Sequence, residues 1–443
     1  MTRTNGESFP IISKLAIEGF KSIKDRREIA LKPLTLISGA NSSGKTSIFQ
    51  PLLLMKQTLE AGFDPGAFLL DGAHVKFTDK EQMLSRIGAS RVDRFAVHLD
   101  TSLGPNLTVT YSAHGKESFQ VVEQKQSYDH AGRTGTSTLK PNMTREEIRA
   151  LFPDNTPNLT PEIFSRIEVQ RSRCFLNLAF IDKDEDSRAG FINMILKPIL
   201  GFASTGFIDY AIRSIIHLPG LRGNPTRAYP VTSIGSNFPG PFHPYTASVI
   251  AKWEKDGDND KLDGLKKDLQ ELGLAWKVLT RKVNLSDVEI KVSRAPRSSR
   301  GGANDVVNIV DVGFGLSQTL PILVALQEAA PGQLVYIEQP EVHLHPAAQY
   351  RLGEVFARAV SRGVRLVVET HSSMLLLSIQ TLVARGDLNQ NDLALQWFTR
   401  DAQGQTQVAA AEVDDKGRFG KWPVDFGDVQ LEAESKLLDA MQS

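Results

Sequence analysis

Residues 34–47 read LTLISGANSSGKTS, an apolar run followed by a loop of small and polar residues and then by a helical pattern. The octet Gly39–Thr46 fits the spacing G-x-x-x-x-G-K-[ST]. In such a loop, glycines let backbone N–H groups cradle phosphate oxygens, the lysine adds a positive charge, and the threonine hydroxyl can bind Mg²⁺. The stretch therefore predicts a strand, a phosphate-binding loop and a helix. The predicted phosphate contacts are Gly39, Asn41, Ser42, Ser43, Gly44, Lys45, Thr46 and Ser47.

A second apolar run ends in acidic residues. Residues 333–346 read QLVYIEQPEVHLHP, and the run Leu334–Ile337 is typical of a buried strand. In open α/β sheets ligands bind beyond the carboxyl ends of the strands, which is where this strand delivers its acids. Glu338 is the candidate Mg²⁺ ligand, directly or through water, and Glu341 can orient or deprotonate an attacking water. The alternative is a structural strand capped by acids, which the upstream loop disfavours.

A third apolar run, RLVVETHSS at residues 365–373, ends in Thr370 and His371. A histidine at such a strand end can donate a hydrogen bond to a terminal phosphate. A lone histidine is more often structural, but the two preceding motifs in the same chain favour a functional role.

Composition narrows the class of protein. The 443 residues are 41% hydrophobic, enough for a folded chain of two or three domains or one domain with an insertion. Lys plus Arg and Asp plus Glu both number 51, so charge does not indicate DNA binding. The single Cys174 excludes an internal disulfide and fits a reducing cytoplasm, where we expect it to be inert and partly buried. The N-terminus lacks a signal-peptide pattern and no apolar run reaches membrane length, so we expect a cytoplasmic protein.

The pattern changes along the chain and predicts three parts. Residues 1–128 combine the phosphate loop with alternating segments from Arg94 onward, typical of antiparallel strands. Residues 129–275 are predicted to be a mainly helical insertion, which includes TPEIFSRIEVQRSRCFLNLAF at 160–180. Residues 276–443 return to strands and, from Val312, alternate helix and strand, which indicates a parallel sheet.

Five stretches together resemble ABC-type ATPases, within them the soluble OLD-like and SMC-like branch. The stretches are GFKSI, GANSSGKTS, DVGFGLSQ, EQPEVHLHP and VVETHS, and the resemblance covers about half of the chain. It implies an α/β ATPase head with a mixed sheet core, an antiparallel β lobe and a mainly helical insertion. Residues 217–230, HLPGLRGNPTRAYP, and 417–428, GRFGKWPVDFGD, are similar to bacterial stand-alone defence ATPases, which pair with a nuclease or toxin, as in the Septu and PARIS systems.

The resemblance also implies roles for single residues. Gly313, Gly315, Ser317 and Gln318 match the ABC signature, which in such heads closes over the ATP held by the phosphate loop of another subunit. The implied cofactors are ATP and Mg²⁺, and the implied assembly is a homodimer or larger homo-oligomer. Phe20 falls where relatives approach the adenine, and Gln82 is a candidate Mg²⁺-sensing glutamine; a strand aromatic and a surface glutamine are the alternatives.

One departure from the family concerns the acidic strand. Many relatives read Asp-Glu-Pro-Glu, with the first Glu as general base, whereas this chain reads Glu338-Gln339-Pro340-Glu341. A glutamine amide can position a water molecule but cannot accept its proton. Either Glu341 is the base or hydrolysis is slow and the ATP-bound form persists. The catalytic candidates are therefore Glu341, Gln339 and His371, with weak basal turnover expected.

Two functions remain in competition, and a transporter subunit fits less well. The first is a sensor or scaffold ATPase of anti-phage defence, which controls a separately encoded nuclease or toxin and responds to a phage protein. The second is an SMC-like DNA-repair or chromosome ATPase, which the lack of sustained heptads disfavours. The basic run SRAPRSSRGG at 293–302 is more typical of a solvated loop than of a phosphate contact. Arg222 and Arg227 could reach a phosphate, contact a partner or serve the loop structurally.

Overall fold

The computed structural model describes residues 11–88, 90–102, 105–114, 118–130, 133–152, 166–180, 205–232, 234–235, 237–295, 305–420, 435–436 and 438–441. The chain divides into two compact units. The first unit comprises Met1–Leu31, Thr46–Ile215 and Arg400–Gln407. The second unit comprises Lys32–Lys45, Ile216–Thr399 and Val408–Ser443. These limits differ from the predicted boundaries at 128 and 275, and each unit is described by itself.

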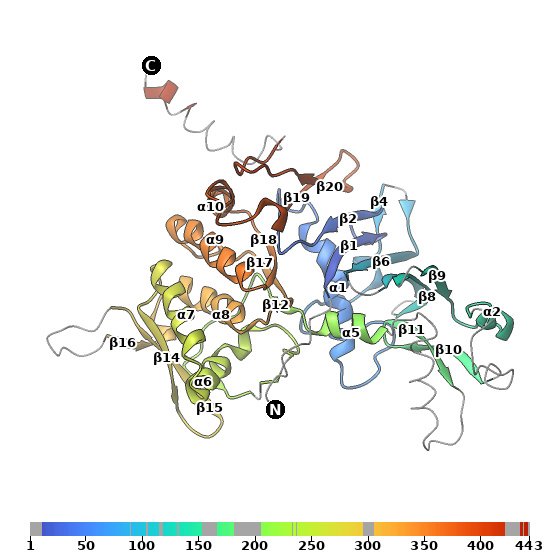
Figure 1. The fold of residues 1–443 in the computed structure, drawn as a ribbon, viewed down its shortest axis with the longest axis horizontal. Helices are drawn as coiled ribbons and strands as arrows, with labels where there is room; N and C mark the ends of the chain where they lie inside the picture. The colour runs from blue at the N-terminus through green and yellow to red at the C-terminus, as the bar shows by residue number, and fades with distance from the viewer. Residues whose placement is uncertain are drawn as a thin grey trace. The chain divides into compact units, whose positions relative to one another are not determined.

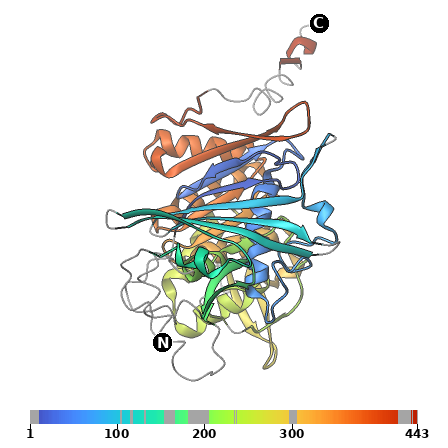
Figure 2. The ribbon, with the colours of Figure 1, turned by 90° about the vertical axis from the view of Figure 1, so that its right-hand side faces the viewer.

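The first unit contains a six-stranded antiparallel sheet (Figure 2). Its strands, in sheet order, are β2 Arg27–Ala30, β1 Ile12–Glu18, β6 Arg94–Thr101, β7 Asn106–His114, β8 Ser118–His130 and β9 Arg133–Leu139. Alternate residues of β6 and β7 face the core, among them Phe95, Val97, Val109 and Tyr111. Because a strand turns successive side chains to opposite faces, this alternation produces one buried and one exposed face. The antiparallel strands predicted from Arg94 onward are confirmed.

The first unit also contains a buried ionic network on helix α1, Lys45–Glu60. Lys56 is fully buried, and its ammonium donates to a carboxylate oxygen of Glu60 at 2.5 Å and to the carbonyl of Arg213 at 2.6 Å. The ring of His74 contacts the other carboxylate oxygen of Glu60 at 3.1 Å. Arg213 ends helix α5, Thr205–Arg213, so the network ties the two helices together.

The predicted helix over residues 160–180 is wrong for its described part. Residues 166–180 instead form an antiparallel hairpin of β10, Ile167–Ser172, and β11, Phe175–Phe180. Arg173 adopts a φ of 55° at the turn, and Cys174 beside it is fully buried. The alternating apolar positions Ile167 and Val169 give β10 a period of two, which a helix cannot place on one face. Burial raises the pKa of the Cys174 thiol, in keeping with the predicted inert cysteine.

The second unit is built on a largely parallel sheet with the strand order β12-β17-β18-β3-β19-β20 (Figure 1). The strands are β12 Ile216–Leu218, β17 Leu334–Glu338, β18 Arg365–Glu369, β3 Leu34–Gly39, β19 Leu393–Arg400 and β20 Thr406–Ala411. Every residue of β3 and β18 is buried, as expected for strands of a parallel sheet covered on both faces. The register aligns Glu338 with Glu369 and Glu369 with Ile37, so three strands end at one edge.

Helices accompany this sheet in the predicted alternation. They are α8 Phe314–Glu328, α9 Pro346–Ser361 and α10 Ser373–Ala384, and α9 packs against α10 (Figure 1). Helices α6, Thr246–Asp256, and α7, Asn259–Glu271, pack against α8. The predicted α/β class with a separate antiparallel sheet is confirmed.

A smaller sheet completes the second unit. It joins β13 Tyr229–Pro230, β15 Asp287–Ser293, β14 Lys277–Lys282 and β16 Val306–Asn308. β15 and β16 are antiparallel and flank the basic run, most of which lies outside the described residues. In the part of the chain that the structure describes, no helix is both long and apolar enough to cross a membrane.

Candidate functional site

The phosphate-loop motif lies between β3 and α1, as predicted. Gly39 and Gly44 have φ values of 142° and 98°, and Ser42 has a φ of 59°. Such positive values turn backbone groups in directions that an ordinary strand or helix does not allow. Gly39 also lies against β19, where an added Cβ would fall 2.1 Å from the carbonyl oxygen of Phe398. This glycine is therefore required by packing as well as by loop geometry.

Lys45 is folded onto its own loop. Its ammonium donates to the carbonyl oxygens of Gly39 at 3.0 Å and Ala40 at 2.6 Å, and the residue is only 4% exposed. Burial lowers the pKa of Lys45, while the charges of Glu369 and Glu341 oppose that shift. A buried lysine cation at the start of helix α1 and at the edge of a parallel sheet is suited to bind phosphate.

Glu338 ends β17 and is held by main-chain and side-chain donors of one neighbouring segment. Its Oε1 lies 3.2 Å from Nε2 of His217, and its Oε2 accepts the N–H of Gly220 at 3.1 Å. His217 lies in β12, which pairs with β17 in parallel, and Gly220 comes two residues after the end of β12. The carboxylate that is the candidate metal ligand is therefore fixed in orientation. Sequence reasoning missed His217 and Gly220, although the short apolar run before Arg222 was a usable signal.

Glu341 and His371 are brought together, and their predicted catalytic roles stay predictions. The backbone N–H of His371 donates to Oε1 of Glu341 at 2.6 Å, and Glu341 is 9% exposed. Burial raises the pKa of Glu341, although the N–H of His371 and the hydroxyl of Thr370 favour its charged form. Burial, and secondly the charge of Lys45, lowers the pKa of His371, so its imidazole is mainly neutral at pH 7.

A third acid at the same edge was missed by sequence reasoning. Glu369 ends β18, is buried, and accepts a hydrogen bond from the hydroxyl of Tyr336 at 3.1 Å. Its charge acts on Lys45, as that of Glu341 does. The signal was present, because Glu369 closes an apolar strand in the same manner as Glu338.

Gln339 adopts a φ of 44°, and its N–H donates to the carbonyl of Glu369 at 2.7 Å. Its side chain lies near Gly220, where an added Cβ would be 3.6 Å from its Oε1. Among the hydrogen bonds of the described residues none joins the Gln339 amide to Lys45, whereas the charge of Glu341 does act on Lys45. Of the two water-activating candidates, Glu341 therefore has the clearer link to the phosphate loop.

The predicted signature begins α8. Gly313 is the N-cap, and an added Cβ there would meet nothing within 4 Å. At Gly315 an added Cβ would lie 2.9 Å from the carbonyl oxygen of His343, so this glycine allows a close approach within its own chain. Phe314 is 54% exposed, and its ring centroid is 5.8 Å from that of His343. The helix start thus presents backbone and an aromatic ring to solvent.

Ser317 and Gln318 face inward instead. The Ser317 hydroxyl donates to the carbonyl of Phe314 at 3.1 Å. The Gln318 amide nitrogen donates to the carbonyl of Gly223 at 2.7 Å, and both side chains are buried. Ser317 lines a cavity of about 200 Å³ between α8 and residues 222–229. Binding of a second subunit's phosphate by this serine stays a prediction.

The two arginines of the GLRGNPTR loop differ in their surroundings. Arg222 is 5% exposed and its guanidinium donates to main-chain carbonyls, whereas Arg227 is 71% exposed at its side chain and pairs with Asp311 at 3.0 Å. Burial lowers the pKa of Arg222 to about 10, opposed by Glu338 and Glu341, so it remains charged at neutral pH. Burial also lowers the pKa of the nearby His243 to about 4.

Phe20 and Gln82 belong to the first unit. Phe20 is fully buried, with its ring edge-on to Phe77 and Phe95, so it is a core residue and not an exposed platform. Gln82 is exposed in a short 3₁₀ turn, and its amide binds the backbone and hydroxyl of Thr78. Their predicted roles toward adenine and Mg²⁺ stay predictions.

The predicted Mg²⁺ site offers one oriented carboxylate, that of Glu338. Among the described residues, no group of three or more His, Cys, Asp or Glu side chains is arranged to hold a metal. Mg²⁺ in nucleotide sites is bound by one or two protein ligands together with phosphate oxygens and water. In the second unit the oriented carboxylate of Glu338 is the candidate ligand, and the role predicted for the hydroxyl of Thr46 stays a prediction.

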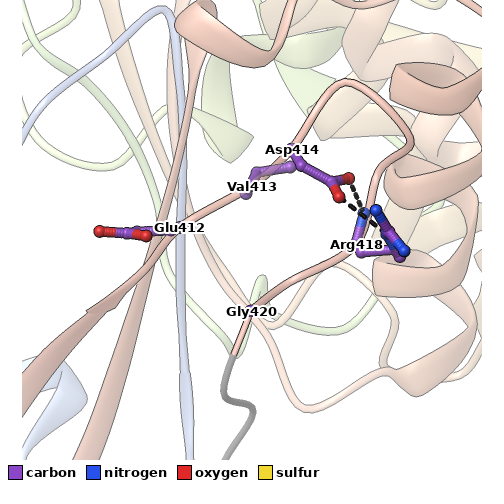
Figure 3. Close-up of a pocket in the computed structure, with 5 residues that line it drawn as sticks. All are labelled: Glu412, Val413, Asp414, Arg418 and Gly420. Carbon is purple, nitrogen blue, oxygen red and sulfur yellow. Dashed lines mark hydrogen bonds and ion pairs between the residues drawn. The ribbon is translucent and has the colours of Figure 1, made fainter.

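Another cavity, of about 450 Å³, is lined by residues near the described end of the second unit. Its lining residues are Glu412, Val413, Asp414, Arg418 and Gly420 (Figure 3). Arg418 pairs with Asp414 at 2.7 Å. None of these residues belongs to the predicted site.

Comparison with solved structures finds SMC heads. One is an SMC head bound to the C-winged helix domain of ScpA, with a TM-score of 0.45 and 13% identity, covering 91% of this chain and 98% of that chain. Another is the SMC head domain from Thermotoga maritima, with a TM-score of 0.41 and 10% identity, covering 91% of this chain and 100% of that chain. A third is a Pyrococcus furiosus Smc head with an extended coiled coil, bound to the C-terminal domain of ScpA. Its TM-score is 0.43 at 13% identity, and the match covers 98% of this chain and 100% of that chain.

Family models match two segments of the chain. Residues 11–103, which contain the phosphate loop, match the model described as "AAA ATPase domain". Residues 259–378, which contain α8, Glu338, Glu341 and His371, match the model described as "AAA domain, putative AbiEii toxin, Type IV TA system". Among curated proteins, none matches the sequence. The chain is therefore similar to AAA-type ATPase domains over both of the segments that carry the predicted site residues.

Proposed function

We propose that the protein binds Mg²⁺–ATP at the phosphate loop and hydrolyses it slowly. The observation that carries this proposal is the buried ammonium of Lys45, which faces the charges of Glu341 and Glu369 at the edge of a parallel sheet. Lys45 would exchange its loop carbonyls for phosphate oxygens, and Glu338 would hold Mg²⁺. When bound, Mg²⁺ would neutralise charge on the phosphates.

Glu341 is the proposed water-activating base. Its raised pKa makes it a better proton acceptor than an exposed carboxylate, and the backbone of His371 fixes its orientation. Gln339 occupies the position at which relatives carry their base and can only position water. This combination supports weak basal turnover, with an ATP-bound state that persists.

We further propose that ATP assembles two or more copies of the chain. The start of α8 offers an N-cap glycine with open space around it and an exposed Phe314, both suited to a contact with another copy. A helix N-terminus favours negative charge, so this end of α8 is suited to close over the phosphates bound by a second copy.

The assembly is proposed to act as a sensor or scaffold in anti-phage defence that controls a separate toxin or nuclease. The match of residues 259–378 to a toxin–antitoxin-type model and the GLRGNPTR stretch support this role. Co-expression with the product of the adjacent gene, followed by purification with and without ATP, tests it. DNA-stimulated hydrolysis with a steep salt dependence, and no stable complex, would favour the SMC-like alternative.

Mass measurement with and without Mg²⁺–ATP tests the assembly. We expect the wild-type mass to at least double with ATP. Phe314→Arg should prevent this association, because it places a charge in the proposed contact. The substitution should not disturb the fold, because the side chain of Phe314 is already half exposed. Leu285→Arg is the matched control, since Leu285 is a fully exposed apolar residue of the β14–β15 turn. If Phe314→Arg still associates like Leu285→Arg, the proposed contact is wrong.

A further inference from the structure

Residues His217–Gly223, here called the bridge segment, contact both the end of β17 and the start of α8. In the proposed function, these two parts of the second unit contact two different ATP molecules. Glu338 at the end of β17 would face the ATP of its own chain, and α8 would face the ATP of another copy. A segment that holds both is placed to relate the state of one site to the state of the other.

On the β17 side the bridge segment holds both the carboxylate and the main chain. His217 and Gly220 contact the two oxygens of the Glu338 carboxylate at 3.2 and 3.1 Å. Nη2 of Arg222 donates to the carbonyl of Glu338 at 2.5 Å and to that of Gln339 at 3.3 Å. A displacement of the acidic strand end must therefore displace Arg222 or break these hydrogen bonds.

On the α8 side the contacts converge on Gln318. Nη1 of Arg222 donates to the carbonyl of Gln318 at 3.4 Å, and the backbone N–H of Arg222 donates to Oε1 of the Gln318 side chain at 3.3 Å. The amide nitrogen of Gln318 in turn donates to the carbonyl of Gly223 at 2.7 Å. The buried amide of Gln318 is thus bound at both of its atoms by the bridge segment.

The burial of Arg222 makes these contacts costly to break. In the part of the chain that the structure describes, no carboxylate lies within ion-pair distance of its guanidinium, and its Nε has no hydrogen-bond partner. The buried guanidinium donates its hydrogen bonds to carbonyls of β17, Gln339 and α8, and the charges of Glu338 and Glu341 also favour its charged form. Hydrogen bonds to a buried charged group are costlier to lose than those between neutral groups, so the two elements are expected to move together. Only the fork of an arginine reaches both sets of carbonyls at once.

We propose that Arg222 is a positioning residue that couples the signature helix α8 to the metal-binding end of β17. The coupling rests on the proposed sandwich of ATP between two copies. Closure of α8 over one ATP is transmitted through Arg222 to Glu338 beside the other ATP, so the two sites hydrolyse cooperatively. Arg222 itself contacts neither nucleotide.

Steady-state hydrolysis as a function of ATP concentration tests the coupling, at protein concentrations so high that ATP-dependent association does not limit the rate. The wild type should give a Hill coefficient above about 1.5, because two coupled sites allow values up to about 2. Arg222→Lys keeps the charge but loses the fork, and should lower the coefficient to about 1 while ATP affinity changes less than about 3-fold. Arg227→Lys is the matched control, because Arg227 is exposed and pairs with Asp311, and should retain the wild-type coefficient.

A second variant guards against a folding defect. Gln318→Met removes the amide that binds the bridge segment but leaves the contacts to Glu338 and Gln339, and should also lower the Hill coefficient to about 1. Thermal melting checks that each variant is folded. A wild-type coefficient of about 1 in an ATP-assembled protein, or a folded Arg222→Lys that keeps the wild-type value, would overturn the coupling alone. A wild type that does not associate with ATP would instead overturn the proposed function.

Discussion

Gly39→Ala should unfold the second unit more readily, and not merely weaken ATP binding. The added methyl group would lie 2.1 Å from the carbonyl oxygen of Phe398 and 2.9 Å from its carbon, both main-chain atoms of the neighbouring strand. The residue also holds a φ of 142°, which L side chains rarely adopt. Backbone strain of about 1–3 kcal/mol and overpacking of about 1–3 kcal/mol together lower the free energy of unfolding by about 4 kcal/mol.

Thermal melting without nucleotide measures this effect. With about 2–4 °C per kcal/mol for a domain of this size, the midpoint of Gly39→Ala should fall by roughly 8–16 °C. Gly386→Ala is the matched control in the same unit, because Gly386 has a φ of 77° but an added Cβ meets nothing within 4 Å. Gly386→Ala should lower the free energy of unfolding by only about 1 kcal/mol. Equal melting temperatures of the two variants would show that the main chain of Phe398 does not restrict residue 39 to glycine.

Three further predictions concern the site and its neighbours. Lys45→Met should lower ATP affinity by about 100-fold or more, since two charge-assisted hydrogen bonds of about 1.5–3 kcal/mol each are lost. Binding of a fluorescent ATP analogue measures the affinity. A decrease in affinity smaller than about 5-fold would contradict this prediction. Glu341→Gln should lower kcat by about 100-fold, whereas Gln339→Glu should change it by less than about 3-fold; a large gain from Gln339→Glu would instead make residue 339 the base position. The third concerns His243, whose burial lowers its pKa to about 4. The unfolded chain gains this proton near pH 6.5, so the contribution of His243 to stability is complete above pH 6.5 and is lost as the pH falls toward 4. The thermal midpoint should drop between pH 7.5 and pH 5, and His243→Asn should reduce that drop.

The sequence predicted the core of the second unit well because its strands are marked by continuous apolar runs with distinctive ends. LTLIS, LVYIE and RLVVE became β3, β17 and β18, and their register brings the predicted Lys45, Glu338, Glu341 and His371 to one edge. Parallel pairing accounts for this success, because it collects strand ends that are far apart in the sequence.

The errors arose where a residue's role depends on long-range contacts. IEVQRSRCF was read as helical, but the turn at Arg173 and Cys174 folds it into a hairpin. Arg222 lies 116 positions from Glu338 and 96 from Gln318, so its bridging contacts leave no local pattern in the sequence. The inward orientation of Ser317 and Gln318 has the same origin, because residues 222–229 pack over that face of α8.

The position of Lys45 has a consequence for ligand selectivity. Its ammonium already donates hydrogen bonds to the carbonyls of Gly39 and Ala40, and a phosphate ligand must replace these hydrogen bonds to bind the ammonium. An incoming ligand gains only the difference between its own oxygens and these two carbonyls. Inorganic phosphate and nucleoside monophosphates replace them with little surplus, whereas a triphosphate brings more charge and additional contacts along the loop. The resting loop is therefore expected to lower the affinity for every phosphate ligand by the same amount, so that only a ligand with further contacts along the loop binds tightly.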